Sequence, residues 1–264
     1  GLFRHEAFLL MIRFDHVTKR FGAKTVLDDV SYEIAKGEVF CLVGPSGTGK
    51  SVSLKHMIRL LTPTSGDVWV GEDCVSAAGA SDLSRIRSRF GYLFQSAALL
   101  AWMNVFENVA LPLREKTKLS EDEIRARVAD ALEKVGLDPD GAAYPSDLSG
   151  GMQKRAGLAR AIVTEPEILL YDEPTSGLDP VTSRMIDELI ADLNNRLGTT
   201  SVVVTHDLHS ALAIADRIAM LSEGKVVDIK PPAEFIASEA PEIRSFLDAQ
   251  YITRRGSWEK ERTA

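Results

Sequence analysis

The sequence predicts an α/β fold with a parallel sheet core, an antiparallel β subdomain and an inserted helical subdomain. Apolar strand-like runs alternate with helical patterns from Ile168 onward. Such alternation implies a parallel sheet that carries ligand groups at the carboxyl ends of its strands. Short strand-like runs crowd residues 12–70, and a helical pattern covers Phe106 to about Ile162.

The first part of the chain is predicted to be rich in strands. Gly1 to Leu10 has no clear period, so we treat residues 1–10 as a tag or upstream extension that does not belong to the fold. Turn-forming residues at Ala35–Gly37 and Thr62–Gly66 separate the runs that follow. These runs are Ile12–Val17, Val30–Ile34, Val39–Val43 and Val68–Val70.

A glycine-rich loop follows Val39–Val43 and precedes a helical pattern that contains Leu54, Met57, Ile58 and Leu61. Its glycines leave backbone N–H groups free to converge on phosphate oxygens, Lys50 can reach the outer phosphates, and the Ser51 hydroxyl can ligate Mg²⁺. A strand, loop and helix in this order predict a site for ATP or GTP. The loop residues of this site are Gly44, Pro45, Ser46, Gly47, Thr48, Gly49, Lys50 and Ser51.

The helical subdomain is predicted at about residues 96–163. Apolar residues from Ile124 to Val135 recur on one helical face, and Ser120 with Glu123 forms a capping box. Because strand-like runs lie on both sides of this region, we expect it to be inserted into the core.

An acidic pair, Asp172 and Glu173, ends the apolar strand Ile168–Tyr171. The first acid could hold the Mg²⁺ shell, and the second could orient and deprotonate an attacking water. A lone acidic pair of this kind is more often a solvated strand end. The phosphate loop in the same chain favours the catalytic interpretation.

Two further polar residues follow apolar strands. His206 comes after Val202–Thr205, which would place it at the sheet edge of the phosphate loop, within reach of a γ-phosphate or the hydrolytic water. Gln95 follows Tyr92–Phe94, so its amide could touch the metal or the water where the two subdomains join. A lone histidine at a strand end is more often structural or exposed, and a lone glutamine there would mean little. Phe21 could equally stack on an adenine ring or pack against the protein.

Ser149, Gly150 and Gly151 open a helix and form a second predicted anion site. Unpaired N–H groups and the helix dipole both favour negative charge at such an end. One chain has little use for two phosphate sites on a single triphosphate. We therefore expect a head-to-tail, two-fold symmetric dimer in which this helix closes over the nucleotide of a second copy.

The last part of the chain returns to alternating structure. Strands are predicted at Ile218–Leu221 and Val226–Asp228, and helices near Thr182–Leu197 and Leu208–Ala215. The tail, residues 231–264, is expected to form one or two docked helices with a frayed end after Arg254. It either caps the domain or binds a second copy or a small regulatory subunit.

Composition limits the classes of function. The 264 residues are 45% hydrophobic and 26% charged, as in an ordinary globular protein with one substantial core. A formal net charge of -7 argues against nucleic acid as a partner. The apolar run Ala7–Ile12 is far shorter than the ~20 residues of a membrane helix, so we expect no membrane span.

The order of these motifs over Met11–Lys230 resembles the ATP-binding cassette (ABC) ATPases. This resemblance implies a P-loop NTPase (RecA-like) core over residues 11–230, ATP and Mg²⁺ as cofactors, and ATP hydrolysis coupled to transport across a membrane. The matching motifs are Walker A at Gly44–Ser51, the Q-loop at Gln95, the signature at Ser149–Met152, Walker B at Ile168–Asp172, the D-loop at Ser176–Asp179 and the switch histidine at His206.

The same resemblance assigns roles to single residues. Glu173 is the expected catalytic base, supported by His206, Lys50 and Gln95, and Phe21 becomes the expected adenine-stacking residue. The expected Mg²⁺ ligands are Ser51, Gln95 and Asp172. Nucleotide contacts beyond the phosphate loop are expected from Val52, Ser149, Gly150, Gly151 and Asp179.

Two departures from the commonest cassette pattern narrow the resemblance. Val52 stands where Thr is usual, and Met152 stands where Gln is usual. Both variants, with Phe90–Gln95 and Val105–Arg114, resemble the Mla/Mce-type (Ttg2A-like) transport ATPases for phospholipids or toluene tolerance. That group implies an ATPase homodimer on the cytoplasmic face of the membrane, bound to permease subunits, with a small regulatory subunit and a lipid-binding Mce-type protein as further partners.

Two alternatives share the catalytic residues. One is the ATPase of another importer, for amino acids or other small solutes. The other is a soluble ABC ATPase without a transport role, in DNA repair, translation or iron-sulfur assembly. The single cassette, the absence of a long coiled-coil insertion between the motifs and the acidic charge disfavour the second alternative.

Overall fold

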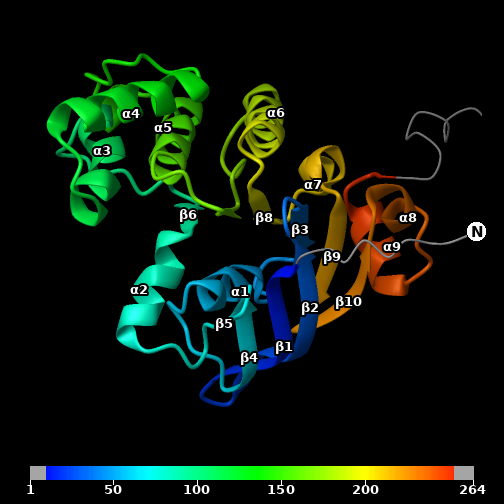
Figure 1. Cartoon of the computed structure of the whole chain (residues 1–264). Helices are drawn as coiled ribbons and strands as arrows, with labels where there is room; N and C mark the ends of the chain where they lie inside the picture. The colour runs from blue at the N-terminus through cyan, green and yellow to red at the C-terminus, as the bar shows by residue number, and fades with distance from the viewer. Residues whose placement is uncertain (1–9, 253–264) are drawn as a thin grey trace, which may run out of the picture.

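The computed structural model describes residues 10–252, and it confirms the predicted α/β fold. In Figure 1 the antiparallel strands β1, β2 and β4 lie below the core strands, and the helices α3, α4 and α5 form a separate group above them. The short helices α8 and α9 lie at the side, next to β9 and β10. The predicted core, β subdomain and helical subdomain are therefore all present.

The core sheet has the strand order β10-β9-β3-β8-β7-β6 in the described part of the chain. Every neighbouring pair is parallel except β9 with β10. β3, β7 and β8 are buried at every residue, which explains their continuous apolar runs. The strands are β3 Val39–Val43, β6 Phe90–Leu93, β7 Ile168–Asp172, β8 Thr200–Thr205, β9 Arg217–Ser222 and β10 Lys225–Lys230.

The second sheet is antiparallel with the order β2-β1-β4-β5. Its strands are β1 Leu10–Phe21, β2 Lys24–Ala35, β4 Ser65–Val70 and β5 Asp73–Cys74. β1 is longer than predicted because a register shift between Phe14 and Val17 lets pairing continue past the point where the alternation breaks. Leu10, which was assigned to the upstream extension, is the first residue of β1.

The helical region consists of α3 Val105–Lys116, α4 Glu121–Lys134, the 3₁₀ turn η1 Pro145–Asp147 and α5 Gly150–Ile162. The capping box of Ser120 and Glu123 at the start of α4 is confirmed. A second capping box, formed by Asn104 and Glu107, starts α3. The chain leaves the core sheet after β6 and returns at β7. The exact subdomain limits, 96–163, 11–230 and 231–264, stay predictions.

The remaining helices are α1 Lys50–Met57, α2 Ala80–Ser88, α6 Pro180–Leu197, α7 Leu208–Ile214, α8 Pro232–Ile236 and α9 Pro241–Ala249. The pattern that extended α1 to Leu61 was wrong, because Arg59 adopts a left-handed φ of 50°. α2 was not predicted, because Leu83 and Ile86 are its only buried residues.

The tail docks on the core, as the sequence predicted. Phe235 of α8 and Ile243 and Leu247 of α9 are fully buried in the same apolar cluster as Leu208 of α7. The predicted frayed end after Arg254 lies outside the described residues.

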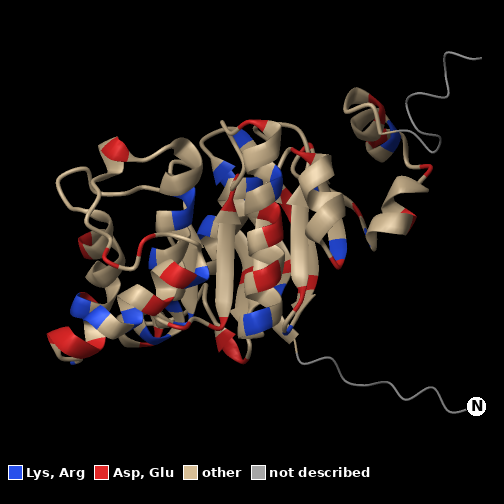
Figure 2. Cartoon of the chain, turned by 90° about the horizontal axis from the view of Figure 1, so that it is seen from above, with Lys and Arg blue, Asp and Glu red and all other residues tan. Residues whose placement is uncertain are grey.

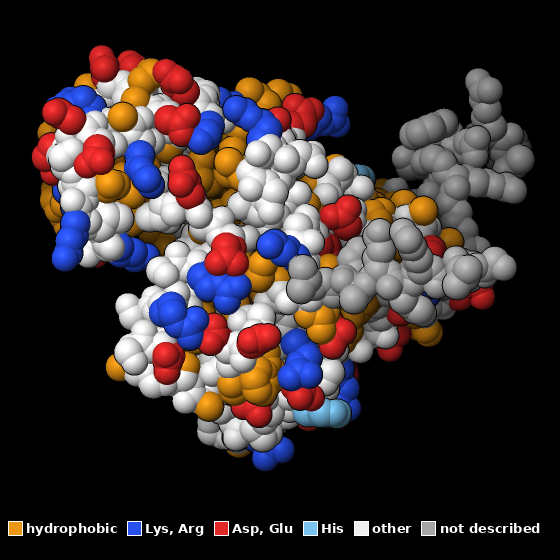
Figure 3. All heavy atoms as spheres, viewed as in Figure 1, with side chains coloured by type: hydrophobic (Ala, Val, Ile, Leu, Met, Phe, Trp, Pro, Cys, Tyr) orange, Lys and Arg blue, Asp and Glu red, His pale blue; other side chains and the backbone are white. Residues whose placement is uncertain are grey.

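The surface carries charges of both signs. Figures 2 and 3 show Lys and Arg interspersed with Asp and Glu over the helical region and the antiparallel sheet, on the faces in view. Among residues 10–252, the helices are too short or too polar for any of them to cross a bilayer.

Candidate functional site

The phosphate loop connects β3 to α1 and depends on glycine at two positions. Gly44 has a φ of 145°, and a Cβ there would lie 2.1 Å from the Leu221 carbonyl oxygen. Gly49 has a φ of 104°, and a Cβ there would lie 2.8 Å from the Val26 oxygen. Gly49 is also the N-cap of α1 and supplies no side-chain cap, so the first N–H groups of α1 stay available to an anion.

Lys50 reaches across the mouth of this loop. Its Nζ donates hydrogen bonds to the carbonyl oxygens of Gly44, at 2.8 Å, and of Pro45, at 2.9 Å. An ammonium has three hydrogens, so one remains for a phosphate oxygen. Burial lowers the pKa of Lys50, and the nearby carboxylates of Glu173 and Asp172 oppose that shift.

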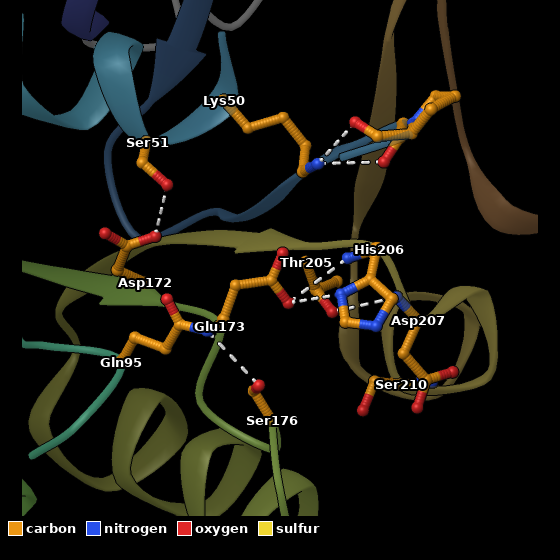
Figure 4. Close-up of polar contacts among 12 residues, drawn as sticks. Lys50, Ser51, Gln95, Asp172, Glu173, Ser176, Thr205, His206, Asp207 and Ser210 are labelled. Carbon is orange, nitrogen blue, oxygen red and sulfur yellow. Dashed lines mark hydrogen bonds and ion pairs between the residues drawn. The ribbon is translucent and has the colours of Figure 1, made fainter. Parts of the chain in front are cut away.

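Ser51 and Asp172 form the centre of the site. The Ser51 hydroxyl, in the first turn of α1, donates to Asp172 Oδ1 at 2.6 Å (Figure 4). Tyr92 of β6 donates its hydroxyl to the other carboxylate oxygen, Asp172 Oδ2, at 3.3 Å. Burial and the charge of Asp172 raise the pKa of Tyr92, so the phenol stays a donor. The Ser51 hydroxyl oxygen and the Asp172 carboxylate lie in contact beside the phosphate loop. Both are suitable ligands for Mg²⁺, which prefers oxygen.

Glu173 follows the end of β7, His206 follows the end of β8, and the two side chains are paired. His206 Nδ1 lies 2.7 Å from Glu173 Oε2, and the His206 backbone N–H donates to the same oxygen at 3.4 Å. Glu173 has a left-handed φ of 50°, and its own N–H donates to the Val204 carbonyl at 2.8 Å. A non-glycine residue in this region indicates backbone strain of the kind found at functional sites. The turn directs the carboxylate from the end of β7 toward β8.

Gln95 lies on the other side of Glu173, after β6. Its side-chain amide donates to Ser176 Oγ of the D-loop at 3.3 Å. Figure 4 shows Glu173 between His206 on one side and Gln95 and Asp172 on the other, below Ser51. The structure therefore brings together Lys50, Ser51, Gln95, Asp172, Glu173 and His206, as the sequence predicted.

Lys154 is a buried residue of this site that the sequence reasoning missed. It lies on α5, is 5% exposed, and donates to the carbonyl oxygens of Gln95, at 2.5 Å, and Glu173, at 3.1 Å. Burial lowers the pKa of Lys154, against the attraction of Glu173 and Asp172. A single ammonium thus ties the helical region to the backbone of the acidic pair. Its position two residues after Met152 in an otherwise apolar helix face was the available signal.

The Ser149 end of α5 faces solvent. Ser149 is the N-cap of α5, and its Oγ accepts from the Met152 N–H at 3.3 Å, which leaves the hydroxyl proton free for another acceptor. Ser149 and Gly150 are exposed, and Gly151 is buried. A Cβ on Gly151 would lie 2.5 Å from Thr182 Cγ2, so this helix end approaches the start of α6 closely.

Asp179 caps α6 within its own chain. Its Oδ1 accepts from the N–H groups of Val181 and Thr182, at 3.0 and 3.1 Å, and its Oδ2 accepts from the Thr182 hydroxyl at 2.5 Å. These bonds lower the pKa of Asp179. A contact between Asp179 and a nucleotide stays a prediction.

Phe21 and Val52 lie near the loop rather than in the hydrogen-bonded centre. Phe21 ends β1, is 47% exposed, and has the Lys19 ammonium 5.0 Å from its ring centroid. It pairs with Lys24 in the β1–β2 hairpin, and Val26 of the same hairpin lies next to Gly49 of the loop. Val52 is partly buried against the antiparallel sheet and the core. Nucleotide contacts by either residue stay predictions.

Comparison with known proteins agrees with this geometry. A family model described as ABC transporter matches residues 27–176. The chain is 43% identical over 245 residues to the probable ribonucleotide transport ATP-binding protein mkl of Mycobacterium leprae, covering 93% of this chain and 71% of that protein. It is 40% identical over 227 residues to the intermembrane phospholipid transport system ATP-binding protein MlaF of Escherichia coli, covering 86% and 84%.

Two further similarities concern an importer and a solved structure. The methionine import ATP-binding protein MetN of Caulobacter vibrioides is 43% identical over 220 residues, covering 83% of this chain and 66% of MetN. The dimeric post-hydrolysis state of the ATP-binding cassette MJ0796, bound to ADP and Pi, matches with a TM-score of 0.76 and 35% identity, covering 84% of this chain and 99% of that one.

Proposed function

Because this chain belongs to the ABC transporter family and is an ATP-hydrolysing, ATP-binding subunit, we propose that it drives a phospholipid or related lipid through a separate membrane permease. The observation that carries this proposal is the similarity to MlaF along most of the chain. Val52 and Met152, which resemble the same group, support it. Neither residue needs to touch cargo, since this subunit supplies the driving force.

In the proposed mechanism, the N–H groups of the phosphate loop and the free hydrogen of Lys50 hold the outer phosphates of ATP. Ser51 and Asp172 are the side chains that would hold Mg²⁺, which when bound neutralises charge on the phosphates. The 2.6 Å contact between their oxygens supports that assignment. Gln95 is proposed to contact the metal or the water from the opposite side.

Glu173 is proposed to orient and deprotonate the attacking water. Its Oε2 is engaged by His206, while Oε1 remains to accept a proton from a water near the γ-phosphate. His206 is proposed to hold the carboxylate in place and to contact the γ-phosphate. The left-handed backbone at Glu173 supports this role, because it brings the carboxylate to the histidine.

We propose that the Ser149 end of α5 from a second copy of the chain completes the nucleotide site. The exposed Ser149 hydroxyl and the first-turn N–H groups of α5 suit a γ-phosphate. The dimeric MJ0796 cassette supports a dimer, and we propose that the two copies are arranged head to tail. Phe21 would stack on the adenine, and Val52 and Asp179 would complete the nucleotide contacts. Closure would draw the two helical regions together, and hydrolysis would let them part.

The proposed setting is the inner face of the cell membrane, with permease subunits as partners. A small regulatory subunit and a lipid-carrying Mce-type protein are proposed as further members of the assembly, because Val52 and Met152 resemble the Mla/Mce-type ATPases. We propose residues 96–163 as the helical subdomain, and we propose no nucleic acid as a partner.

The test is isolation of the full chain with its native membrane partner in a mild detergent. Lipid extraction and mass spectrometry of the complex should recover a bound phospholipid or related lipid. Recovery of a ribonucleotide or of methionine would contradict the lipid proposal and favour the cargoes named for mkl or MetN. Purification of active ATPase with no membrane partner would instead support the soluble alternative.

A further inference from the structure

The tail of the chain reaches the catalytic histidine through one side chain, Gln250. Gln250 follows α9, and its Oε1 accepts a hydrogen bond from the Leu208 N–H at 2.8 Å. Its Nε2 donates to the carbonyl oxygen of His206 at 2.7 Å. A single amide thus clamps the backbone on both sides of Asp207. Because one partner is a donor and the other an acceptor, the orientation of the amide is fixed.

This clamp completes the hydrogen bonding of the segment that carries His206. Asp207 caps the N–H groups of His209 and Ser210, at 2.8 and 3.4 Å, and its own N–H donates to Thr205 Oγ1 at 3.0 Å. Leu208 is the first residue of α7, and its N–H has no intrahelical acceptor. Gln250 supplies that acceptor from a part of the chain 42 residues away.

The position of His206 matters because its ring meets Glu173. A shift of the His206 backbone would move Nδ1 from its 2.7 Å contact with Glu173 Oε2. Its backbone N–H, which also faces Oε2, would move with it. His206 is therefore the one residue that connects Gln250 to Glu173, the proposed base. Small displacements of a catalytic group can cost much of the rate.

The tail is anchored firmly enough to hold this amide. Ile243 and Leu247 of α9 are fully buried against the core, and the Ile252 N–H donates to the Leu247 carbonyl at 3.0 Å just beyond Gln250. Figure 1 shows α9 beside the core strands on the side of α7. Gln250 itself is only partly buried. Its bonds are therefore a modest part of the overall stability, because exposed groups can bond to water instead.

We propose that Gln250 is a positioning residue for ATP hydrolysis, through which the C-terminal tail sets the geometry of His206. This inference rests on the proposed roles of His206 and Glu173. It assigns the tail a part in catalysis beyond covering the core. A partner that moved α9 would change the rate of hydrolysis without touching the nucleotide.

Two substitutions test the clamp in the full-length chain. Gln250→Leu keeps most of the side-chain volume and removes both bonds. Gln250→Glu keeps an acceptor for the Leu208 N–H but turns a carboxylate oxygen toward the His206 carbonyl, which repels it. Ser245→Ala is the matched control, because Ser245 is an exposed residue of α9, the helix that Gln250 follows.

Steady-state hydrolysis, ATP affinity and thermal unfolding are measured for each chain. We expect kcat to fall about threefold to tenfold in both Gln250 variants, the effect of losing one or two hydrogen bonds. KM, ATP affinity and the unfolding temperature should match Ser245→Ala. The ¹⁵N resonance of His206 Nδ1, assigned by its loss in His206→Gln, should shift in both variants.

Unchanged kcat in both Gln250 variants would overturn the inference. So would a lower kcat that comes with an equal loss of ATP affinity, or one confined to a variant that unfolds at the assay temperature. Glu173→Gln and His206→Ala are assayed in parallel. If they lose hydrolysis while the Gln250 variants keep it, only this inference fails; if they keep it, the proposed function of the site fails as well.

Discussion

The phosphate loop and the Ser149 end of α5 differ in how complete they are within one chain. Around the loop, Lys50 donates to the Gly44 and Pro45 carbonyls at 2.8 and 2.9 Å. Ser51 donates to Asp172 at 2.6 Å, and Glu173 is fixed by His206. At the end of α5, Ser149 and Gly150 are exposed to solvent. The first region is assembled by one chain, whereas the second presents groups that suit an anion brought by another molecule.

Because of this difference, substitutions in the two regions should cause different defects. Changes around the loop should impair chemistry or nucleotide binding in each chain by itself. Changes at the end of α5 should leave nucleotide binding by one chain intact and impair only what depends on a second copy. The following substitutions test that division, beginning with the largest expected effect.

Glu173→Gln removes the carboxylate proposed to deprotonate water and keeps the side-chain size. Hydrolysis should fall at least about a hundredfold, the usual contribution of a general base, while ATP binding is retained. Phosphate release and binding of a fluorescent ATP analogue measure the two properties. Glu242→Gln, on an exposed position of α9, is the control. Turnover equal to that of the parent chain would eliminate Glu173 as the base.

Lys50→Ala should weaken ATP binding about tenfold to a hundredfold, because a charge-assisted bond to phosphate is lost from a buried position. Isothermal titration of the monomer with ATP measures the dissociation constant. Lys55→Ala removes an exposed lysine from the same helix and should bind normally. Unchanged affinity in Lys50→Ala would contradict the phosphate-loop assignment.

Lys154→Met should slow hydrolysis about threefold to tenfold with little loss of stability. The substitution removes the bonds to the Gln95 and Glu173 carbonyls, which loosens the acidic pair. It also removes a buried charge, which is costly to desolvate. The loss of the hydrogen bonds lowers the free energy of unfolding and the loss of the buried charge raises it, so the net change is small. Urea denaturation measures the stability, and steady-state hydrolysis measures the rate. A large loss of stability with normal kcat would show that Lys154 is structural only.

Asp187→Asn should change how the stability of the protein depends on pH, and it should leave hydrolysis unchanged. Burial, followed by the charges of Asp207 and Glu188, raises the pKa of Asp187 from 3.8 to about 6, although Ser210 donates to its Oδ2. The folded state therefore holds a proton that the unfolded state releases, so stability falls as pH rises from 3.8 to about 6.

The amide of Asn does not ionise, so the variant avoids the cost of a buried negative charge above about pH 6. At pH 8 the variant should be more stable than the parent by on the order of 2 kcal/mol, and the difference should vanish near pH 4. Thermal unfolding at both values of pH is the measurement. Equal stability at pH 8 would refute the raised pKa, and altered kcat would extend the catalytic region to α6.

The sequence predicted the loop and strand-end residues because their signal is local. Glycine spacing, a buried strand before the loop and two acids at the end of β7 each lie within a few neighbouring residues. Parallel strands then bring Ser51, Asp172 and His206 to one edge of the sheet, so their meeting follows from the topology.

The sequence could not reveal contacts that tertiary packing creates. Lys154 stands out as a charge on an apolar helix face, but its partners are defined only when α5 folds against the loop after β6. Gln250 follows a short helix, and only the docking of α9 brings it to His206. The lengths of β1 and α1 depended on a bulge and on one left-handed residue, which local patterns do not specify.

The central claim is that the Ser149 end of α5 completes the nucleotide site of a second copy. Sedimentation of the Glu173→Gln chain with Mg-ATP tests it most directly, alone and combined with Ser149→Arg or with Ser146→Arg, an exposed serine just before the same helix. We predict dimers for Glu173→Gln and for its combination with Ser146→Arg, and ATP-bound monomers for its combination with Ser149→Arg. A dimer of unchanged affinity in the Ser149→Arg chain would contradict the claim.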